Sequence, residues 1–299
     1  MSGPPPSSRL SFSASVARVF DLSLGQMLWS RRSVFLGLVV GGPVVMAASV
    51  RALTWLALGR YDVWFPLPAR HLRQLAEGSD GIGGMQVDGA ALFGIMIWLL
   101  YVRVIVPVLG VFYGTALIAD EVDDKTLTYL FTRPIPRSAV LAGKYLAYLA
   151  CTSLLVMPSV VLVFFLAVPI GASSVAAEFP GLVADLGMVA LGLAAYGAVF
   201  AFVGTSVKRP LVAGLIFAFG WEPAILLVPG YLKWLSVAYY LQGLVKHEMP
   251  QESPVSALLQ VFREVPSLAT SLVALAIIVF LGVSLAGRAV ERREYVLEQ

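Results

Sequence analysis

The stretch Asp120–Lys144, with the sequence DEVDDKTLTYLFTRPIPRSAVLAGK, separates two long apolar runs of the chain. It contains four acidic residues, four basic residues and two prolines among its 25 residues. The acids come first, a short apolar segment follows, and the prolines come after it. The flanking runs contain few charged residues. The role of this stretch therefore depends on whether those runs lie in a membrane or in the core of a soluble protein.

The composition is that of an integral membrane protein. Of the 299 residues, 59% are hydrophobic and only 13% are charged, and the mean hydropathy is +0.84. Soluble domains carry about a quarter charged residues, so a soluble globule of this composition would leave too much apolar surface in water. The net charge of +3 does not indicate a nucleic-acid partner, because the basic residues are dispersed at the ends of apolar segments.

Six segments are long and apolar enough to span a bilayer, which takes about 20 residues per helix. We therefore expect an all-α integral membrane protein with six transmembrane helices, built as a single domain over residues 1–299. An amphipathic interfacial helix is expected at 12–31, re-entrant or interfacial helices before the sixth span, and disorder at 1–11. The six segments are 34–58, 91–119, 141–170, 182–207, 211–232 and 268–287.

The distribution of Lys and Arg predicts the orientation of these spans. Thirteen of these residues fall on the side that holds both chain termini and the central loop, and six fall on the other side. The positive-inside rule then places both termini in the cytoplasm, which agrees with an even number of spans.

The central loop itself has the pattern of a short amphipathic helix. Leu127, Leu130 and Phe131 share one helical face, the acids before them suit the positive end of the helix dipole, and Pro134 and Pro136 end the helix. Its apolar face would lie on the bilayer or dock into a groove of a soluble partner. An ordinary solvated loop is the simpler alternative.

The run IADEVDDKTLTYLFTRPIPRSAVLAGKYLA resembles the signature of permease subunits of ABC-2-type ABC transporters, in particular the branch that includes copper-enzyme-maturation and gliding-type permeases. In such permeases an acidic segment leads into a Thr-Leu-x-x-Leu helix, a Pro-containing turn and a Gly-Lys pair, here Gly143 and Lys144. Lys125 stands where the family often has glycine. The resemblance implies that this helix is a cytoplasmic coupling helix in contact with an ATPase. The implied contact residues are Glu121, Asp123, Asp124, Thr126, Leu127, Leu130, Phe131, Arg133, Pro134, Pro136 and Arg137.

The resemblance also implies the partners. The chain has no phosphate-binding loop G-x-x-x-x-G-K-[ST], so it is not expected to be an enzyme, and ATP and Mg would be bound by two copies of a separate ABC ATPase subunit. A second permease copy or homologue would complete the pathway, and the resemblance implies export of an unidentified substrate across a bacterial or archaeal cytoplasmic (inner) membrane. His71 and His247 lie far apart, and no cofactor or metal site is expected in this chain.

Two charged residues fall near the middle of predicted spans, Arg103 in the second and Glu222 in the fifth. Charges at such depth are costly and are often functional, and we expect the two residues to form a buried pair with a structural role. Arg51 and Asp185 lie closer to the outer ends of their spans and are expected to reach the lipid headgroups.

Three other functions remain open. An ion-coupled secondary carrier usually shows internal repeats and several midplane acids, whereas this chain shows one central acid and no repeat. A membrane-embedded enzyme would require a cluster of His or acidic residues within the spans, and no histidine lies in any of them. A non-transporting scaffold or mechanotransmission subunit, driven by a partner ATPase, would share every feature named above.

Overall fold

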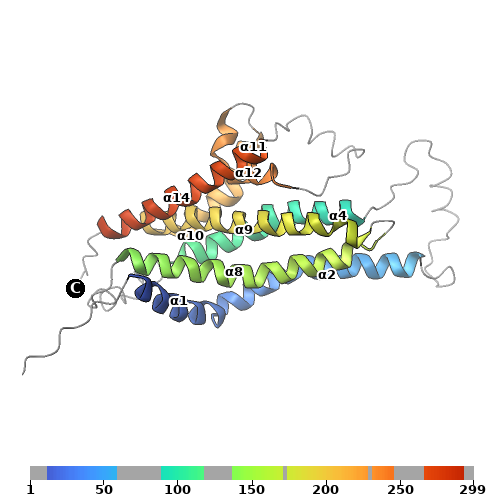
Figure 1. The fold of residues 1–299 in the computed structure, drawn as a ribbon, viewed down its shortest axis with the longest axis horizontal. Coiled ribbons are helices and arrows are strands. Elements are labelled where there is room, and N and C mark those ends of the chain that lie inside the picture. The colour runs from blue at the N-terminus through green and yellow to red at the C-terminus, as the bar shows by residue number, and fades with distance from the viewer. Residues whose placement is uncertain are drawn as a thin grey trace, which may run out of the picture.

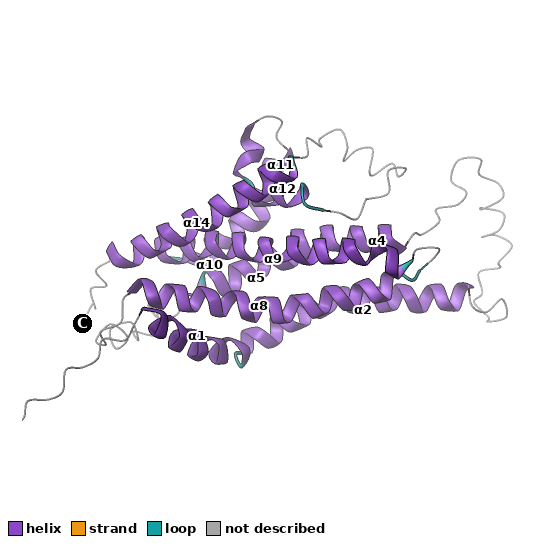
Figure 2. Cartoon of the chain, in the orientation of Figure 1, coloured by secondary structure: helices purple, strands orange, loops and turns teal. Residues whose placement is uncertain are grey.

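The computed structural model describes residues 12–58, 89–117, 137–170, 174–227, 231–245 and 266–292. Within these ranges every regular element is helical. The long helices lie side by side along the long axis of the molecule, and the last of them, α14 (Leu268–Arg292), crosses the others at an angle (Figures 1 and 2). Residues 1–11, expected to be disordered, and the central loop 118–136 lie outside the described residues.

Among the described residues, five helices are long and apolar enough to cross a membrane, and they coincide with five of the six predicted spans. The predicted fifth span is a shorter helix, formed by α10 (Pro210–Ile216), the π-helical segment η3 (Phe217–Trp221) and α11 (Glu222–Leu227). The prediction of an all-helical protein that crosses the membrane several times is therefore confirmed, while the count of six stays a prediction. The five helices are Arg32–Thr54, Gly89–Gly114, Ser138–Ala167, Val175–Ser206 and Leu268–Glu291.

The predicted N-terminal helix is present as α1 (Phe12–Leu28). It packs along the beginning of α8 (Arg137–Ala167), at the same end of the bundle as the end of α14 (Figure 1). Gly143 allows this approach: a Cβ atom added there would lie 2.8 Å from the carbonyl oxygen of Val16 and 2.8 Å from the Cβ of Val19. The glycine of the Gly-Lys pair thus has a packing role.

The second membrane helix consists of α4 (Gly89–Met96), η1 (Ile97–Ile105), α5 (Val106–Leu109) and η2 (Gly110–Gly114), and the two η segments are π-helical. Single-turn π-bulges in α-helices occur frequently at functional sites. In the second membrane helix, Gly110 lies against the aromatic ring of Phe200 and Gly114 lies against its Cβ atom. This is the small-residue packing that membrane helices favour.

Helix α9 (Val175–Ser206) is the central element, since it contacts the second span, α8, α10 and α14. Gly282 of α14 approaches the backbone of Ala198, with a virtual Cβ only 2.8 Å from its carbonyl carbon. On another side Gly197 receives the ring of Tyr148, whose hydroxyl donates a hydrogen bond of 2.9 Å to the carbonyl of Leu193. Small residues on α9 and α14 thus let α9 approach both of these neighbours closely.

Polar side chains also join the first three spans. Helix α2 (Arg31–Leu58) contains Pro43, and proline deprives a helix of one backbone hydrogen bond. Close to this point Ser159 of α8 donates to the carbonyl of Val40 at 2.8 Å, and Tyr101 donates to Ser159 at 2.6 Å. Side chains from neighbouring helices therefore supply polar partners beside the proline, as is typical of membrane proteins.

The segment before the last span contains two short helices, η4 (Tyr231–Leu235) and α12 (Val237–Gln242). Helix α12 packs against α9, η1 and α14, and neither helix is long enough to span a bilayer. This arrangement agrees with the expectation of short re-entrant or interfacial helices, as far as residues 231–245 describe it.

Candidate functional site

The predicted ATPase-contact residues lie almost entirely outside the described part of the chain. The exception is Arg137, whose backbone opens α8. The structure instead describes the two helix ends that hold this loop, the end of the second span at Leu117 and the beginning of α8. The geometry of these two ends is what the structure contributes to the predicted coupling site.

Lys144 ties these two ends together. It is buried, with 8% of its surface exposed, and its ammonium group donates a hydrogen bond of 2.9 Å to the carbonyl oxygen of Leu117. Lys144 therefore joins α8 to the last described residue before the central loop.

A second contact joins the same region to the N-terminal helices. At the junction of α1 and α2, Ser30 and Ser33 both donate to the carbonyl of Met27. Because the proton of Ser33 is engaged there, the hydroxyl of Tyr113 in the second span donates to Ser33, at 2.7 Å. The start of the first span is thus held to the second span, a short distance along the chain from the loop that Lys144 closes.

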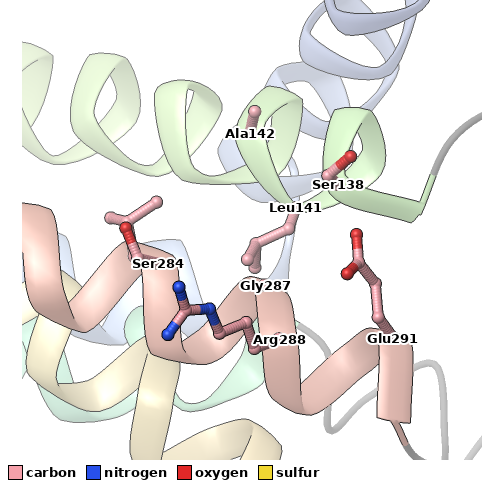
Figure 3. Close-up of a pocket in the computed structure, with 8 residues that line it drawn as sticks. Ser138, Leu141, Ala142, Ser284, Gly287, Arg288 and Glu291 are labelled. Atoms are coloured by element: carbon pink, nitrogen blue, oxygen red, sulfur yellow. The ribbon is translucent and has the colours of Figure 1, made fainter.

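A cleft of about 260 Å³ opens at this end of the molecule between the first turns of α8 and the last turns of α14. Leu141 and Gly287 line its apolar part, and Ser138, Arg288 and Glu291 add polar groups. The carboxylate of Glu291 points toward α8, whereas the guanidinium of Arg288 lies along α14 toward Ser284 (Figure 3). A charged rim over an apolar floor is typical of a membrane–water boundary.

Arg103 lies in the π-helical segment η1, near the middle of the second span. Its guanidinium carbon lies 5.3 Å from the centre of the Trp98 ring, a cation–π geometry. Tyr196 of α9 and Glu222 lie within electrostatic range. In the described part of the chain, the guanidinium donates no hydrogen bond to a protein acceptor and no carboxylate oxygen lies within ion-pair distance of it.

Glu222 follows the π-helical segment η3 directly and is buried, with 2% of its surface exposed. Its carboxylate accepts hydrogen bonds from the hydroxyl of Ser236, from the backbone N–H of Val237 at 2.9 Å and from that of Ala238 at 3.4 Å. These groups form the N-terminal end of α12, where a negative charge is stabilised by free N–H groups. Glu222 therefore attaches the short helix α12 to the middle of the fifth predicted span.

The structure thus brings Arg103 and Glu222 into the same region but gives each a different direct partner. Arg103 lies over the ring of Trp98, and Glu222 accepts a hydrogen bond from Ser236. Neither partner was identified from the sequence. The signal for Ser236 was available, because a serine directly before a helical segment is a typical N-cap, and it does accept a hydrogen bond from the N–H of Tyr239 at 3.2 Å.

One expectation about the outer ends of the spans is wrong. Asp185 does not reach the headgroups, since it is completely buried in the bundle, where helix contacts enclose it. Arg51 is exposed and donates to the carbonyl of Leu166 at 3.2 Å, near the end of α8. Position along a span alone did not distinguish these two cases, because the rotation of each helix determines which side chains face its neighbours.

Within the residues that the structure describes, no three His, Cys, Asp or Glu side chains are close enough together to hold a metal ion. The arrangement instead joins helices: one lysine closes the base of a loop, and one glutamate fixes a short helix. Together with the five helices of membrane-spanning length among the described residues, these contacts are those of a multi-pass helical membrane protein.

Comparison with known protein families agrees with this class and makes it specific. The family model described as "ABC-2 family transporter protein" matches residues 69–282, which is more than two thirds of the chain. The chain therefore belongs to the ABC-2 family of transporter membrane proteins, and it is a permease of the ABC transporter class. No curated protein matches the chain significantly.

Proposed function

We propose that this chain forms half of the transmembrane pathway of an ABC exporter and converts ATP hydrolysis by a partner into a conformational change of its spans. Family membership supports the permease role and implies an ABC ATPase partner. In this proposal the predicted helix 121–131 is the coupling helix, two ATPase copies act on two permease copies, and both termini face the cytoplasm of a bacterial or archaeal cell.

The contact between Lys144 and Leu117 carries the proposal. A loop that receives force from a soluble motor transmits it only if the helices at its two ends respond together. The hydrogen bond of 2.9 Å joins the end of the second span to the start of α8 at the base of the loop. The packing of Gly143 against α1 adds the N-terminal helix to the same unit. A displacement of the loop would therefore reach three helices at once.

The test is co-purification of the chain from its native membranes in mild detergent, followed by identification of the proteins that stay bound. The test variant carries Leu127→Asp and Leu130→Asp, which place charges on the predicted contact face. The matched control carries Thr128→Asp and Thr132→Asp, which add the same charges away from that face. We expect an ATPase with a phosphate-binding loop to accompany the wild type and the control but not the test variant.

Recovery of the chain alone would contradict the permease proposal, and retention of the ATPase by the test variant would contradict the position of the coupling helix. A non-transporting mechanotransmission subunit is the second candidate, because it would bind the same ATPase. Vesicles that contain the complex distinguish the two, since only a transporter gives ATP-dependent movement of a solute. An ion-coupled carrier would need no ATPase and is disfavoured by the family.

A further inference from the structure

Arg103 lies at the middle of the second membrane helix. The membrane-spanning helix runs from Gly89 to Gly114, which are 14 and 11 residues away from Arg103. At 1.5 Å per residue the two ends are roughly 21 Å and 17 Å away. A charged side chain at such depth almost always faces the interior of a bundle or a water-filled cavity, because hydrocarbon cannot solvate it.

The described residues leave the side of the helix that carries Arg103 partly uncovered. Ile95 and Leu99 precede Arg103 at intervals of four residues, and they are 39% and 55% exposed. The arginine itself is half-buried. Since lipid would not stabilise its charge, this stripe faces either a second copy of the chain or an aqueous path between the copies.

Among the described residues, Glu222 lies within electrostatic range of the guanidinium, but no carboxylate oxygen is close enough to form an ion pair with it. In the described spans, away from their end turns, the acidic residues are Asp185 and Glu222, and both are buried, with 0% and 2% of their surface exposed. The carboxylate of Glu222 is engaged by Ser236 and by two backbone N–H groups of α12. A second copy would present the same buried acids, so the anion that pairs with Arg103 is not expected to come from the described part of a partner copy.

We propose that Arg103 binds the anionic group of an amphipathic molecule, a sulfonate, phosphate or carboxylate carried on an apolar body. The ring of Trp98 fixes the guanidinium by its cation–π contact, and Ile95 and Leu99 offer an apolar surface to the rest of the molecule. This inference rests on the proposed permease function, in which such a molecule is the transported substrate. An anionic lipid that enters the path would use the same chemistry.

The test uses two probes with the same aromatic body, anilinonaphthalene sulfonate and the neutral N-phenylnaphthylamine. The full-length chain is placed in nanodiscs of phosphatidylcholine, and saturable binding is followed by probe fluorescence. We expect Arg103→Gln to weaken sulfonate binding about tenfold or more, because hydrogen bonds to charged groups are the strong ones. The neutral probe should bind the variant and the wild type alike.

Arg51→Gln is the matched control, since Arg51 is also an arginine within a spanning helix but lies near its outer end. It should bind the sulfonate as the wild type does. Equal sulfonate binding by the Arg103→Gln variant and the wild type would overturn the proposal, and so would an equal loss in the Arg51→Gln control. Competition by added phosphatidylglycerol would identify a lipid as one source of the anion, provided that the competition also requires Arg103.

A second measurement needs no substitution and therefore does not depend on the folding of a variant. Phenylglyoxal modifies accessible arginines, and mass spectrometry identifies which ones react. The sulfonate should protect Arg103 but not Arg51, and the neutral probe should protect neither. If the sulfonate does not protect Arg103, the proposed anion site is wrong, even if the ATPase co-purifies with the chain. Failure of this inference is therefore distinguishable from failure of the proposed function.

Discussion

The ammonium group of Lys144, near the start of α8, donates a hydrogen bond of 2.9 Å to the carbonyl oxygen of Leu117 at the end of the second span. The 26 residues between them include the central loop, so a single side chain closes the base of the segment that the family resemblance assigns to ATPase contact. This contact gives the lysine of the Gly-Lys pair a physical role, which is to hold two membrane helices together where they leave the bundle.

Replacement of Lys144 by Met should lower the stability of the chain by about 1–3 kcal/mol, because it removes a charged hydrogen-bond donor to the carbonyl of Leu117. The melting temperature of the purified chain in detergent measures this effect. Lys208→Met is the control, since Lys208 is exposed on the connection between α9 and α10 and surface substitutions usually change stability by less than about 0.5 kcal/mol. Equal melting temperatures for the two variants would show that the hydrogen bond between Lys144 and Leu117 does not stabilise the bundle.

Gly143→Ala should loosen α1 from α8. The added Cβ would lie 2.8 Å from the backbone oxygen of Val16, a separation that forces one helix to move, and overpacking of this kind typically costs about 1–3 kcal/mol. Faster proteolytic cleavage within α1 is the expected readout. Gly25→Ala, on α1 itself, adds a methyl group with nothing within 4 Å and should leave the cleavage rate unchanged.

Gly197→Ala should be among the more damaging changes in α9, because the new Cβ would overlap the ring of Tyr148. The ring would have to turn away, and its hydrogen bond to the carbonyl of Leu193 would be lost with it. We expect a destabilisation of roughly 2–4 kcal/mol from overpacking and the lost bond together. Gly187→Ala in the same helix meets no atom within 4 Å, and a comparable loss of stability in that variant would refute the explanation.

Glu222→Ala should release the N-terminal end of α12. Loss of a capping side chain costs about 0.5–2 kcal/mol, and the amides of Val237 and Ala238, which donate to this carboxylate, should exchange hydrogen faster. Glu222→Gln keeps one acceptor oxygen and should have a smaller effect. Unchanged exchange at both amides in the alanine variant would mean that the carboxylate does not hold this helix.

The hydrogen bonds from α12 to the Glu222 carboxylate also bear on the expected pairing of Arg103 with Glu222. A guanidinium at position 222 has no acceptor for the N–H groups of α12, so the exchange of charges, Arg103→Glu with Glu222→Arg, should not restore the assembly that either single change disturbs. Recovery of the monodisperse, folded protein in the double variant, measured by size-exclusion chromatography in detergent, would instead establish a direct pair as the dominant interaction.

Much of the fold could be predicted because bilayer-spanning helices are specified by local properties. About 20 apolar residues suffice to form one, so the segments around Leu36, Val111 and Leu193 were located without knowledge of their neighbours. The short helix at 237–242 and the helix at 12–28 were likewise visible in local patterns. The same local criterion did not distinguish a full span from the shorter helix that begins at Pro210.

The candidate site was predictable only in part. Depth along a span identified Arg103 and Glu222 as unusual, because burial of charge is costly wherever the helix points. Depth did not reveal that the carboxylate serves α12 or that the guanidinium lies over Trp98, because these contacts depend on how the helices are rotated. Asp185 shows the same limit: its distance from the helix end suggested a headgroup contact, yet its side chain lies inside the bundle.

By itself, the sequence determined the class of this protein, the position of its apolar helices and the family signature around its central loop, since these follow from composition, periodicity and local motifs. The tertiary structure alone decided which side chains meet: Lys144 with Leu117, Glu222 with the start of α12, and Gly143 with α1. The physical reason is that hydrophobicity places a helix in the bilayer without specifying its rotation, whereas close packing of glycines and satisfaction of buried polar groups select one rotation for each helix.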